Sequence, residues 1–508
     1  MHENQEGLSK AIFDKLKEEG CCERCCLRYI GIKDITYYRN LNLINDKFKV
    51  VTEDNENEGK PSAPKKTKLT PCIACLDLLR DSEDYKTICK DVEAKGYDAK
   101  SFTCALSLPV SLQIREKSVL LFLSRQFPAV YAMNDMPNGF YNYVNLKDAW
   151  KWTYGAKIAE LLNMKMDFGP IQDFFIEVNI TYPDDEKESS CLLKMHADIF
   201  ERRAKHRYRY GGEIFTRKSV EVALADTTYE RFHSHSPCPP AIPTVPVRYA
   251  PVTCSQNSLF VAGRYNKYSR TLSQTPWVID GERRAESSVQ ELIGENIVKA
   301  FKAQGSKFSA SGREDVDVRT LGRGRPFAVE LLDPHRVNIE PNELRMLQDE
   351  INANSLGKIS IRDLQIVSKE ELCKLKYGEE EKKKRYTALC IALTPPPPGA
   401  LESLSEKVHD LVLHQKTPIR VLHRRPLVER LRTIHGATAE VIPSRADSDQ
   451  SVYFVLRLRT QAGTYVKEFV HGDFGRTEPN LRSILGVEVD ILALDVEEVE
   501  LDWPKEVN

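Results

Sequence analysis

The chain has 508 residues, enough for roughly two to four domains with sizeable hydrophobic cores. Its 73 Lys and Arg residues balance 74 Asp and Glu residues, and the net charge of −1 excludes a protein that attracts nucleic acid over its whole surface. The 13 cysteines form no regular secretory framework, and no apolar run is long enough to span a bilayer. We therefore expect an intracellular protein with reduced thiols and no membrane contact, in which any affinity for nucleic acid is local.

Apolar residues at helical spacing predict the first element, a helix over residues 8–16. Residues 53–68 are polar, contain Gly and Pro and show no apolar periodicity, so they are predicted to form a disordered insert. Two strands are predicted further on, one over 107–112 and one over 174–182, where apolar and polar residues alternate clearly.

Five prolines between residues 237 and 247 separate two regions, and we place the domain boundary near residue 250. Beyond it, a capping box at 288–291 opens a helix that is predicted to run to about residue 301. The further predicted elements are a strand and turn at 326–337, strands at 386–393 and 451–459, a helix at 404–413 and a strand pair at 487–501. The second half is therefore predicted to be mixed α+β with substantial sheet.

Two cysteine pairs of the form Cys-x-x-Cys indicate a metal site: Cys22 with Cys25, and Cys72 with Cys75. Four thiolates suit one tetrahedral zinc ion, and four protein ligands leave no open position for a substrate, so the site is expected to be structural. The 46 residues between the pairs are long for a compact zinc ribbon and require the polar insert to loop out. The alternative is a set of buried free thiols.

The segment 308–323 is the most informative charged stretch. It holds three carboxylates, Glu314, Asp315 and Asp317, and three arginines, Arg313, Arg319 and Arg323. A guanidinium near a carboxylate favours the ionised form, and an ionised carboxylate without metal ligands beside it is a candidate nucleophile. The alternative is a solvated cluster of surface salt bridges.

Basic segments point to a nucleic-acid surface. Residues 416–432 contain six Lys or Arg and one acidic residue, residues 264–270 alternate cations with tyrosines, and residues 205–217 are also basic. Cations neutralise phosphates, and aromatic faces stack on exposed bases, so three such segments favour RNA over ordinary exposed surface. The candidate RNA contacts are Arg264, Lys267, Arg270, Arg420, Arg424 and Arg425.

Four longer blocks, at 263–282, 312–327, 420–426 and 463–481, resemble the signature blocks of the Pus-ten type of tRNA pseudouridine synthase, as do both cysteine pairs. The likeness covers nearly the whole chain, and its blocks occur in order. It implies an α+β protein with a zinc-stabilised, THUMP-containing RNA-binding region over 1–250. A mixed α/β pseudouridine synthase catalytic domain with an antiparallel sheet core would follow over 251–508.

The resemblance also implies roles for single residues. The Gly-Arg-x-Asp core of pseudouridine synthases makes Asp315 the catalytic aspartate, with Arg313 helping to hold the flipped nucleotide or its gap. The Lys-x-Tyr block makes Tyr386 the ring that packs on the target base. The Gly-Thr-Tyr block places Lys467 where related synthases of another type have Arg, and Lys467 is expected to pair with Asp315 as a point charge.

The function that the resemblance implies is isomerisation of uridine to pseudouridine in the T arm of tRNA, at uridine 54, uridine 55 or both, through an Asp nucleophile. This chemistry requires no redox or nucleotide cofactor, and the sequence has neither a P-loop nor a convincing dinucleotide fingerprint. The expected partners are tRNA and other structured RNAs, and the protein is expected to be a monomer in the cytoplasm and nucleus.

Three alternatives fit part of the pattern. A non-catalytic RNA-binding adaptor would use the same zinc and THUMP-like surfaces but has no need of an ionised Asp315 between cations. A methyltransferase or thiolation enzyme would need a cofactor-phosphate or adenosyl pocket, and the sequence has no such loop. A zinc deaminase would need a His-x-Glu motif, which does not occur in the sequence.

Overall fold

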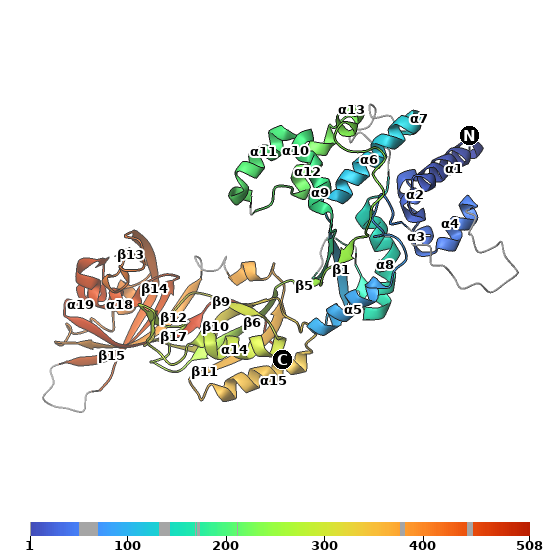
Figure 1. Ribbon diagram of the computed structural model, residues 1–508. Coiled ribbons are helices and arrows are strands. Elements are labelled where there is room, and N and C mark those ends of the chain that lie inside the picture. The colour runs from blue at the N-terminus through green and yellow to red at the C-terminus, as the bar shows by residue number, and fades with distance from the viewer. Residues whose placement is uncertain are drawn as a thin grey trace. The chain divides into compact units, whose positions relative to one another are not determined.

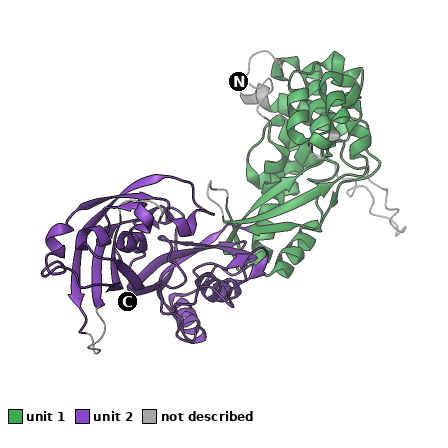
Figure 2. Cartoon of the chain, turned by 90° about the vertical axis from the view of Figure 1, so that its left-hand side faces the viewer, with its two compact units in different colours: residues 1–255 green, residues 256–508 purple. Residues whose placement is uncertain are grey.

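The computed structural model describes residues 2–49, 70–131, 143–167, 169, 173–210, 212–375, 382–443 and 451–507. The chain divides into two units, residues 1–255 and 256–508 (Figure 2). The boundary predicted from the prolines, near residue 250, lies five residues before this division. The predicted insert at 53–68 lies outside the described residues. Among the helices that the described ranges contain, none has the length and apolar character needed to cross a membrane.

The first unit combines a small sheet with many helices (Figure 1). Its helices are α1 (His2–Glu18), α2 (Glu23–Ile30), α3 (Ile35–Arg39), α4 (Leu41–Phe48), α5 (Asp84–Lys95), α6 (Ser111–Gln126), α7 (Pro128–Tyr131), α8 (Leu146–Leu162), α9 (Asp185–Ser189), α10 (Cys191–Met195), α11 (Ala197–Lys205), α12 (Arg217–Ala225) and α13 (Tyr229–His233), with a 3-10 turn η2 (Arg207–Tyr210). Its strands are β1 (Ser101–Ser107), β2 (Lys165–Met166), β3 (Phe174–Thr181), β4 (Arg248–Tyr249) and β5 (Thr253–Gln256). The sheet order is β2-β1-β3-β4, with β5 also paired to β3.

Two sequence predictions for this unit are confirmed and one is wrong. The helix predicted at 8–16 lies within α1, and the strand predicted at 174–182 is β3. The strand predicted at 107–112 is wrong, because β1 ends at Ser107 and α6 begins at Ser111. The backbone N–H of Ser111 donates to Asp185 Oδ1 at 2.7 Å. This distant carboxylate satisfies one of the free N–H groups at the helix start, which local apolar content cannot reveal.

The second unit is built on a ten-stranded sheet of order β11-β6-β10-β17-β12-β15-β14-β13-β16, with β9 also paired to β10 (Figure 1). The strands are β6 (Leu259–Lys267), β9 (Gly305–Ala310), β10 (Arg319–Leu332), β11 (Ile359–Val367), β12 (Lys383–Ala392), β13 (Leu411–Lys416), β14 (Glu429–Val441), β15 (Val452–Gln461), β16 (Thr477–Glu478) and β17 (Val489–Val499), beside a hairpin of β7 (Val278–Ile279) and β8 (Glu282–Arg283). The helices are α14 (Val289–Phe301), α15 (Pro341–Asn354), α17 (Leu404–Lys407), α18 (Val466–His471) and α19 (Leu481–Leu485), with 3-10 turns η3 (Ile419–Val421) and η4 (Gly472–Gly475). The neighbouring strands pair antiparallel except β10 with β17, so the predicted mixed α/β fold class is confirmed.

The predicted helix after the capping box is α14, whose N-cap Ser288 accepts a hydrogen bond from Glu291 N. Two other predictions are wrong. The helix predicted at 404–413 is only the four-residue α17, followed by β13, and the strand pair predicted at 487–501 is the single strand β17. That strand pairs with β12 from Val489 to Val499 and with β10 only at Asp495 and Val496.

Strand register brings three separate segments to one place. Val496 of β17 pairs with Thr320 of β10 on one side and with Tyr386 of β12 on the other. The loop that precedes β10, residues 311–318, therefore emerges beside Tyr386. Helix α18, which follows β15, and the segment after β13 complete the surroundings of that loop.

Candidate active site

A cleft of about 510 Å³ lies at this meeting point in the second unit. The loop before β10 contributes Arg313 and Asp315, and β12 contributes Tyr386. The 3-10 turn η3 contributes Arg420, and α18 contributes Lys467. A cleft of this size accepts a small-molecule-sized group such as a nucleoside.

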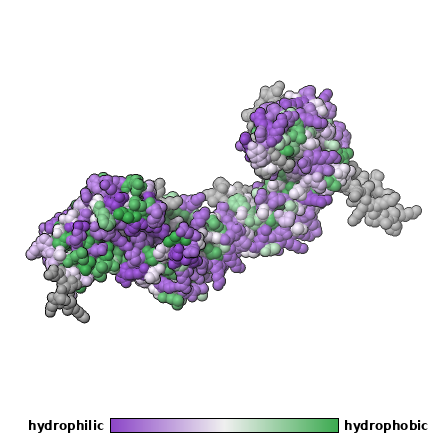
Figure 3. Space-filling view, turned by 60° about the vertical axis from the view of Figure 1, so that its left-hand side comes forward, coloured by the Kyte–Doolittle hydropathy of each residue, from purple (hydrophilic) through white to green (hydrophobic). Residues whose placement is uncertain are grey.

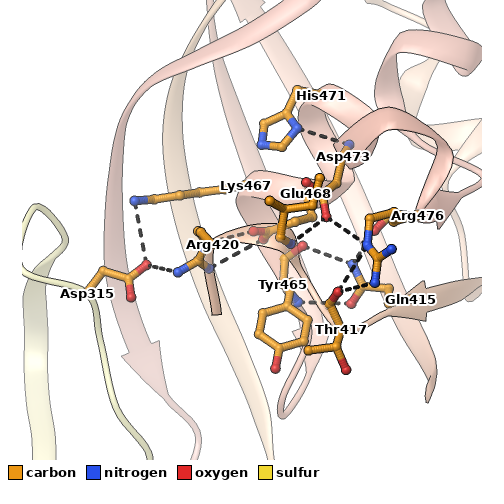
Figure 4. A network of polar contacts seen from close by, with 12 residues as sticks. Asp315, Gln415, Thr417, Arg420, Tyr465, Lys467, Glu468, His471, Asp473 and Arg476 are labelled. Atoms are coloured by element: carbon orange, nitrogen blue, oxygen red, sulfur yellow. Dashed lines mark hydrogen bonds and ion pairs between the residues drawn. The ribbon is translucent and has the colours of Figure 1, made fainter. Parts of the chain in front are cut away.

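Three cations surround the carboxylate of Asp315, which is 30% exposed, and Figure 4 shows two of them, Arg420 and Lys467. Arg420 Nη1 lies 2.7 Å from Asp315 Oδ2, Lys467 Nζ lies 3.6 Å from the same oxygen, and Arg424 Nη2 lies 4.0 Å from Oδ1. Arg420 also contacts Glu468, whose carboxylate is 1% exposed, at 2.6 Å. The shortest ion pair of Asp315 is therefore with an arginine that is itself fixed by a buried carboxylate.

Lys467 contacts Asp317 more closely than Asp315. Its Nζ lies 2.7 Å from Asp317 Oδ2, against 3.6 Å from Asp315 Oδ2. Partial burial acts to raise the pKa of Asp317, but the hydrogen bond and charge of Lys467 outweigh it and lower this pKa. The expected pairing of Lys467 with Asp315 is thus present only as a secondary contact.

The arginines nearest in sequence are not the cations that contact Asp315. Arg319 Nε donates to Asp495 at 3.0 Å, and Arg323 lies 2.7 Å from Glu506. Arg313 is exposed and lines the cleft. The predicted cluster of sequence neighbours is therefore wrong, and the charges on Asp315 come from residues more than a hundred positions later.

Glu314, next to Asp315 in the loop, is buried and anchors the loop to the interior of the second unit. Its carboxylate is 0% exposed, lies 2.8 Å from Arg325 Nε and accepts a hydrogen bond from Tyr265 Oη at 2.8 Å. Arg325 Nη1 in turn donates to Ser311 O at 2.7 Å. Burial and the adjacent Glu314 charge both raise the pKa of Tyr265, so its hydroxyl stays a donor. No pattern in the sequence marked Glu314 or Arg325 for this role.

Lys267 fixes the same loop through its backbone. Its Nζ donates to Asp315 O at 3.1 Å, Val316 O at 2.8 Å and Leu272 O at 2.8 Å, and its side chain is buried. Burial is the main cause that lowers the pKa of Lys267 to about 8. The predicted role of Lys267 as an RNA contact is therefore wrong.

Arg264 is also buried, so its predicted RNA contact is wrong too. Its guanidinium donates to four backbone carbonyls at 2.9 to 3.0 Å, those of Arg323, Gly324, Leu501 and Trp503. Both Arg264 and Lys267 lie on β6, which is flanked in the sheet by β10 and β11. This interior position explains why a basic, tyrosine-rich sequence is not exposed. Arg270, just after β6, is half-buried and lies 2.7 Å from Asp495.

The other three predicted RNA contacts belong to the segment that begins at η3. Arg420 contacts Asp315 and Glu468, as described above. Arg424 and Arg425 are exposed, and both line the cleft. Their role as RNA contacts stays a prediction.

Tyr386 is half-buried and presents its ring to the cleft from β12. Burial raises the pKa of its hydroxyl, opposed in part by the charge of Arg325, so the phenol is neutral at physiological pH. This uncharged ring and the Asp315 carboxylate line the same cleft. The ring can therefore pack on a planar group while the atoms bonded to that group face the carboxylate.

The four predicted cysteines come together in the first unit. The Sγ atoms of Cys22, Cys25, Cys72 and Cys75 all lie within 4.8 Å of one another and are buried. The backbone N–H of Cys22 donates to Cys72 Sγ at 3.2 Å, and Asp77 Oδ1 accepts from Cys72 N at 2.8 Å. Such N–H···S bonds stabilise thiolates, so this donor set fits a metal ion that takes four sulfur ligands.

The fold and the cleft define a two-unit α/β protein with a cation-lined, nucleoside-sized site. Residues 260–500 match the family model described as "Pus10, C-terminal", and residues 72–254 match "Eukaryotic Pus10, N-terminal". The chain belongs to the Pus10 family, and the resemblance inferred from the sequence blocks is confirmed.

Relatives along nearly the full length support this assignment. The chain is 39% identical over 537 residues to "tRNA pseudouridine synthase Pus10" of Homo sapiens and 38% identical over 527 residues to that of Xenopus laevis, covering 98% of both chains in each case. A protein of the same name from Thermofilum pendens is 41% identical over 243 residues, which are 48% of this chain and 52% of that one. Among solved structures, a Cbf5-Nop10-Gar1 complex is 17% identical over 47% of this chain and 48% of that chain, with a TM-score of 0.25.

Proposed function

We propose that this protein is a tRNA pseudouridine synthase that isomerises uridine in the T arm, at position 54, position 55 or both, with Asp315 as the nucleophile. The observation that carries the proposal is the Asp315 carboxylate, held at 2.7 Å by Arg420 in a cleft that Tyr386 also lines. Membership of the Pus10 family and the names of the relatives that match along nearly the full length support the reaction and the substrate.

The reaction is an isomerisation. The bond between N1 of uracil and the ribose carbon breaks, the base turns, and C5 of the base bonds to the same carbon, while a proton leaves C5 and one is gained at N1. The ionised Asp315 acts covalently on the sugar or the base. Arg420, Arg424 and Lys467 compensate its negative charge from η3, from the segment after it and from α18.

The target uridine must leave its stack to reach Asp315, which costs a few kcal/mol by the general energetics of base flipping. Stacking of the extruded base on Tyr386 offsets part of this cost. The exposed guanidiniums of Arg313, Arg424 and Arg425 around the cleft neutralise the neighbouring phosphates. The protein groups thus divide into one that bonds to the nucleotide, one that packs on its base, and three that hold its backbone.

The test is direct. Unmodified tRNA transcript is incubated with the full chain, and pseudouridine is mapped by carbodiimide-dependent reverse-transcription stops, with Asp315→Asn as the matched control. We expect stops at position 54 or 55 with the wild-type protein and none with the variant, while both bind the transcript equally well. Stops elsewhere would refute the T-arm assignment, and full turnover by Asp315→Asn would move the nucleophile to Asp317.

The cysteine cluster supports one structural zinc ion, held by Cys22, Cys25, Cys72 and Cys75. Zinc would supply folding free energy to the first unit and take no part in the isomerisation, since four protein ligands leave no open position. We further propose that the first unit acts as a THUMP-containing RNA-binding region and that the protein works as a monomer. The adaptor alternative is not favoured, because cations gathered on Asp315 serve no purpose in passive binding.

A further inference from the structure

Phe474 is the most exposed large apolar side chain among the described residues, at 95%. It lies in η4, directly after α18, the helix that carries Lys467 at its other end. Other apolar residues are exposed too, and Figure 3 shows green areas in several places on one face, so exposure alone does not mark a site. The backbone of Phe474 and its surroundings set it apart.

Four successive residues adopt left-handed backbone angles here. Gly472 has φ 80°, Asp473 φ 45°, Phe474 φ 54° and Gly475 φ 78°. Glycine tolerates this conformation, but two consecutive non-glycine residues in it are strained and persist only where the surrounding structure enforces them. The strained turn directs the Phe474 side chain out of the protein.

Contacts of Asp473 enforce this turn, as Figure 4 shows. Asp473 is buried; its Oδ2 accepts from Ile419 N at 3.2 Å, and its backbone N–H donates to His471 Nδ1 at 3.1 Å. Arg476 lies 3.7 Å from the same carboxylate and donates to Thr417 O at 2.7 Å. Hydrogen bonds thus link the turn that exposes Phe474 to Thr417 and Ile419, just before Arg420, the arginine that pairs with Asp315.

The ring borders an open depression of about 570 Å³ with a polar and glycine-rich lining. Its lining includes the polar residues Asn480, Ser483 and the half-exposed Arg482, and the glycines Gly472, Gly475 and Gly486. Glu488 also lines it and pairs with Arg482. Among the described residues of this lining, the one aliphatic residue is the half-buried Val487, so an apolar protein partner would find little apolar surface in the depression. A nucleobase needs one aromatic face, with polar groups around it for its edges and backbone.

The short separation between the cleft and Phe474 along α18 also fits a nucleic-acid strand. Helix α18 rises by about 6 Å from Lys467 to His471, at 1.5 Å per helical residue. A nucleic-acid strand whose target uridine occupies the cleft therefore reaches Phe474 within a few nucleotides.

We propose that Phe474 stacks on an unpaired base of the RNA substrate, a few nucleotides from the uridine in the cleft. This inference rests on the proposed function, since it assigns a second contact to the same RNA. Phe474 acts in binding, and the chemical step at Asp315 does not depend on it.

The experiment measures the Kd of the full chain for unmodified tRNA transcript with Phe474→Ala, Phe474→Leu and Phe474→Tyr. Loss of one base–aromatic stack weakens binding by about 5- to 150-fold in Phe474→Ala, as expected for about 1–3 kcal/mol per base. Phe474→Leu keeps an apolar side chain but no ring, and we expect it to behave as Phe474→Ala, whereas Phe474→Tyr retains wild-type affinity. The dependence of Kd on salt should be unchanged, because no phosphate contact is lost.

Leu356 provides the matched control, because it is 83% exposed and also has a left-handed φ of 50° in the second unit. Leu356→Ala should bind as the wild type does. The inference is overturned if Phe474→Ala keeps wild-type affinity or if Phe474→Leu binds as well as Phe474→Tyr. Turnover of the transcript by the wild-type protein is read separately, so a wild type that binds but forms no pseudouridine refutes the proposed function and not the stacking contact.

Discussion

Replacing Glu314 by glutamine removes one negative charge from the interior of the second unit and changes little in shape. Glu314 and Arg325 are 0% and 1% exposed, and their charged atoms lie 2.8 Å apart. Removing one partner of a buried ion pair leaves the other charge uncompensated, which typically costs ~3–5 kcal/mol. For a unit of this size, each kcal/mol lowers the melting temperature by roughly 2–4 °C. We therefore expect the transition of the second unit to fall by about 6–20 °C.

Thermal unfolding of the full chain, followed by circular dichroism and calorimetry, measures this shift for Glu314→Gln, Glu314→Leu, Arg325→Met and the double variant Glu314→Leu with Arg325→Met. The double variant buries no charge and should recover part of the loss, although the hydrogen bond from Arg325 to Ser311 O is then missing. A double variant whose loss equals the sum of the losses in Glu314→Leu and Arg325→Met would refute the reasoning, because the pair would then have no coupling. A fall of less than 1 °C in Glu314→Gln would refute it as well.

Four further outcomes are expected. Arg420→Ala should slow the single-turnover reaction at least about tenfold, ~1.4 kcal/mol, and more than Lys467→Ala does, because Arg420 lies closer to Asp315; equal rates for the two variants would contradict this order. Tyr386→Phe should keep most of the rate and Tyr386→Ala should lose it, and similar rates in both would exclude stacking on this ring. Cys72→Ser should lower the zinc content measured by elemental analysis and the melting temperature of the first unit together, and wild-type protein that contains no zinc would refute the site. The pKa of Lys267 in the folded protein is lowered to about 8, so above that pH the unfolded chain binds more protons than the folded one. The thermal stability of the wild type should therefore rise relative to that of Lys267→Met between about pH 8 and about pH 10. A stability difference that does not depend on pH would contradict this prediction.

Elements with a strong local signal could be predicted from the sequence. The capping box at Ser288 and the alternation of β3 depend on neighbours within a few residues, and both predictions are confirmed. The helix α6 could not be predicted in the same way, because its start is satisfied by Asp185, more than seventy residues later. The cysteine pairs were found because thiolate spacing reflects the ligand geometry directly, whatever lies between the pairs.

The surroundings of Asp315 show why charged segments are harder to interpret. A run of cations such as Arg264 to Arg270 has the same composition whether it covers a surface or crosses the middle of a sheet, and only the pairing of β6 with β10 and β11 decides between the two. Once Arg264 and Lys267 are interior, their charges must be satisfied, and backbone carbonyls of the turns around β10 satisfy them. The consequence is functional, because the carbonyl of Asp315 is one of these acceptors. Lys267, from the segment whose composition looked most suited to holding RNA, instead holds the loop that carries Asp315. The exposed arginines that line the cleft are Arg313 and, after η3, Arg424 and Arg425.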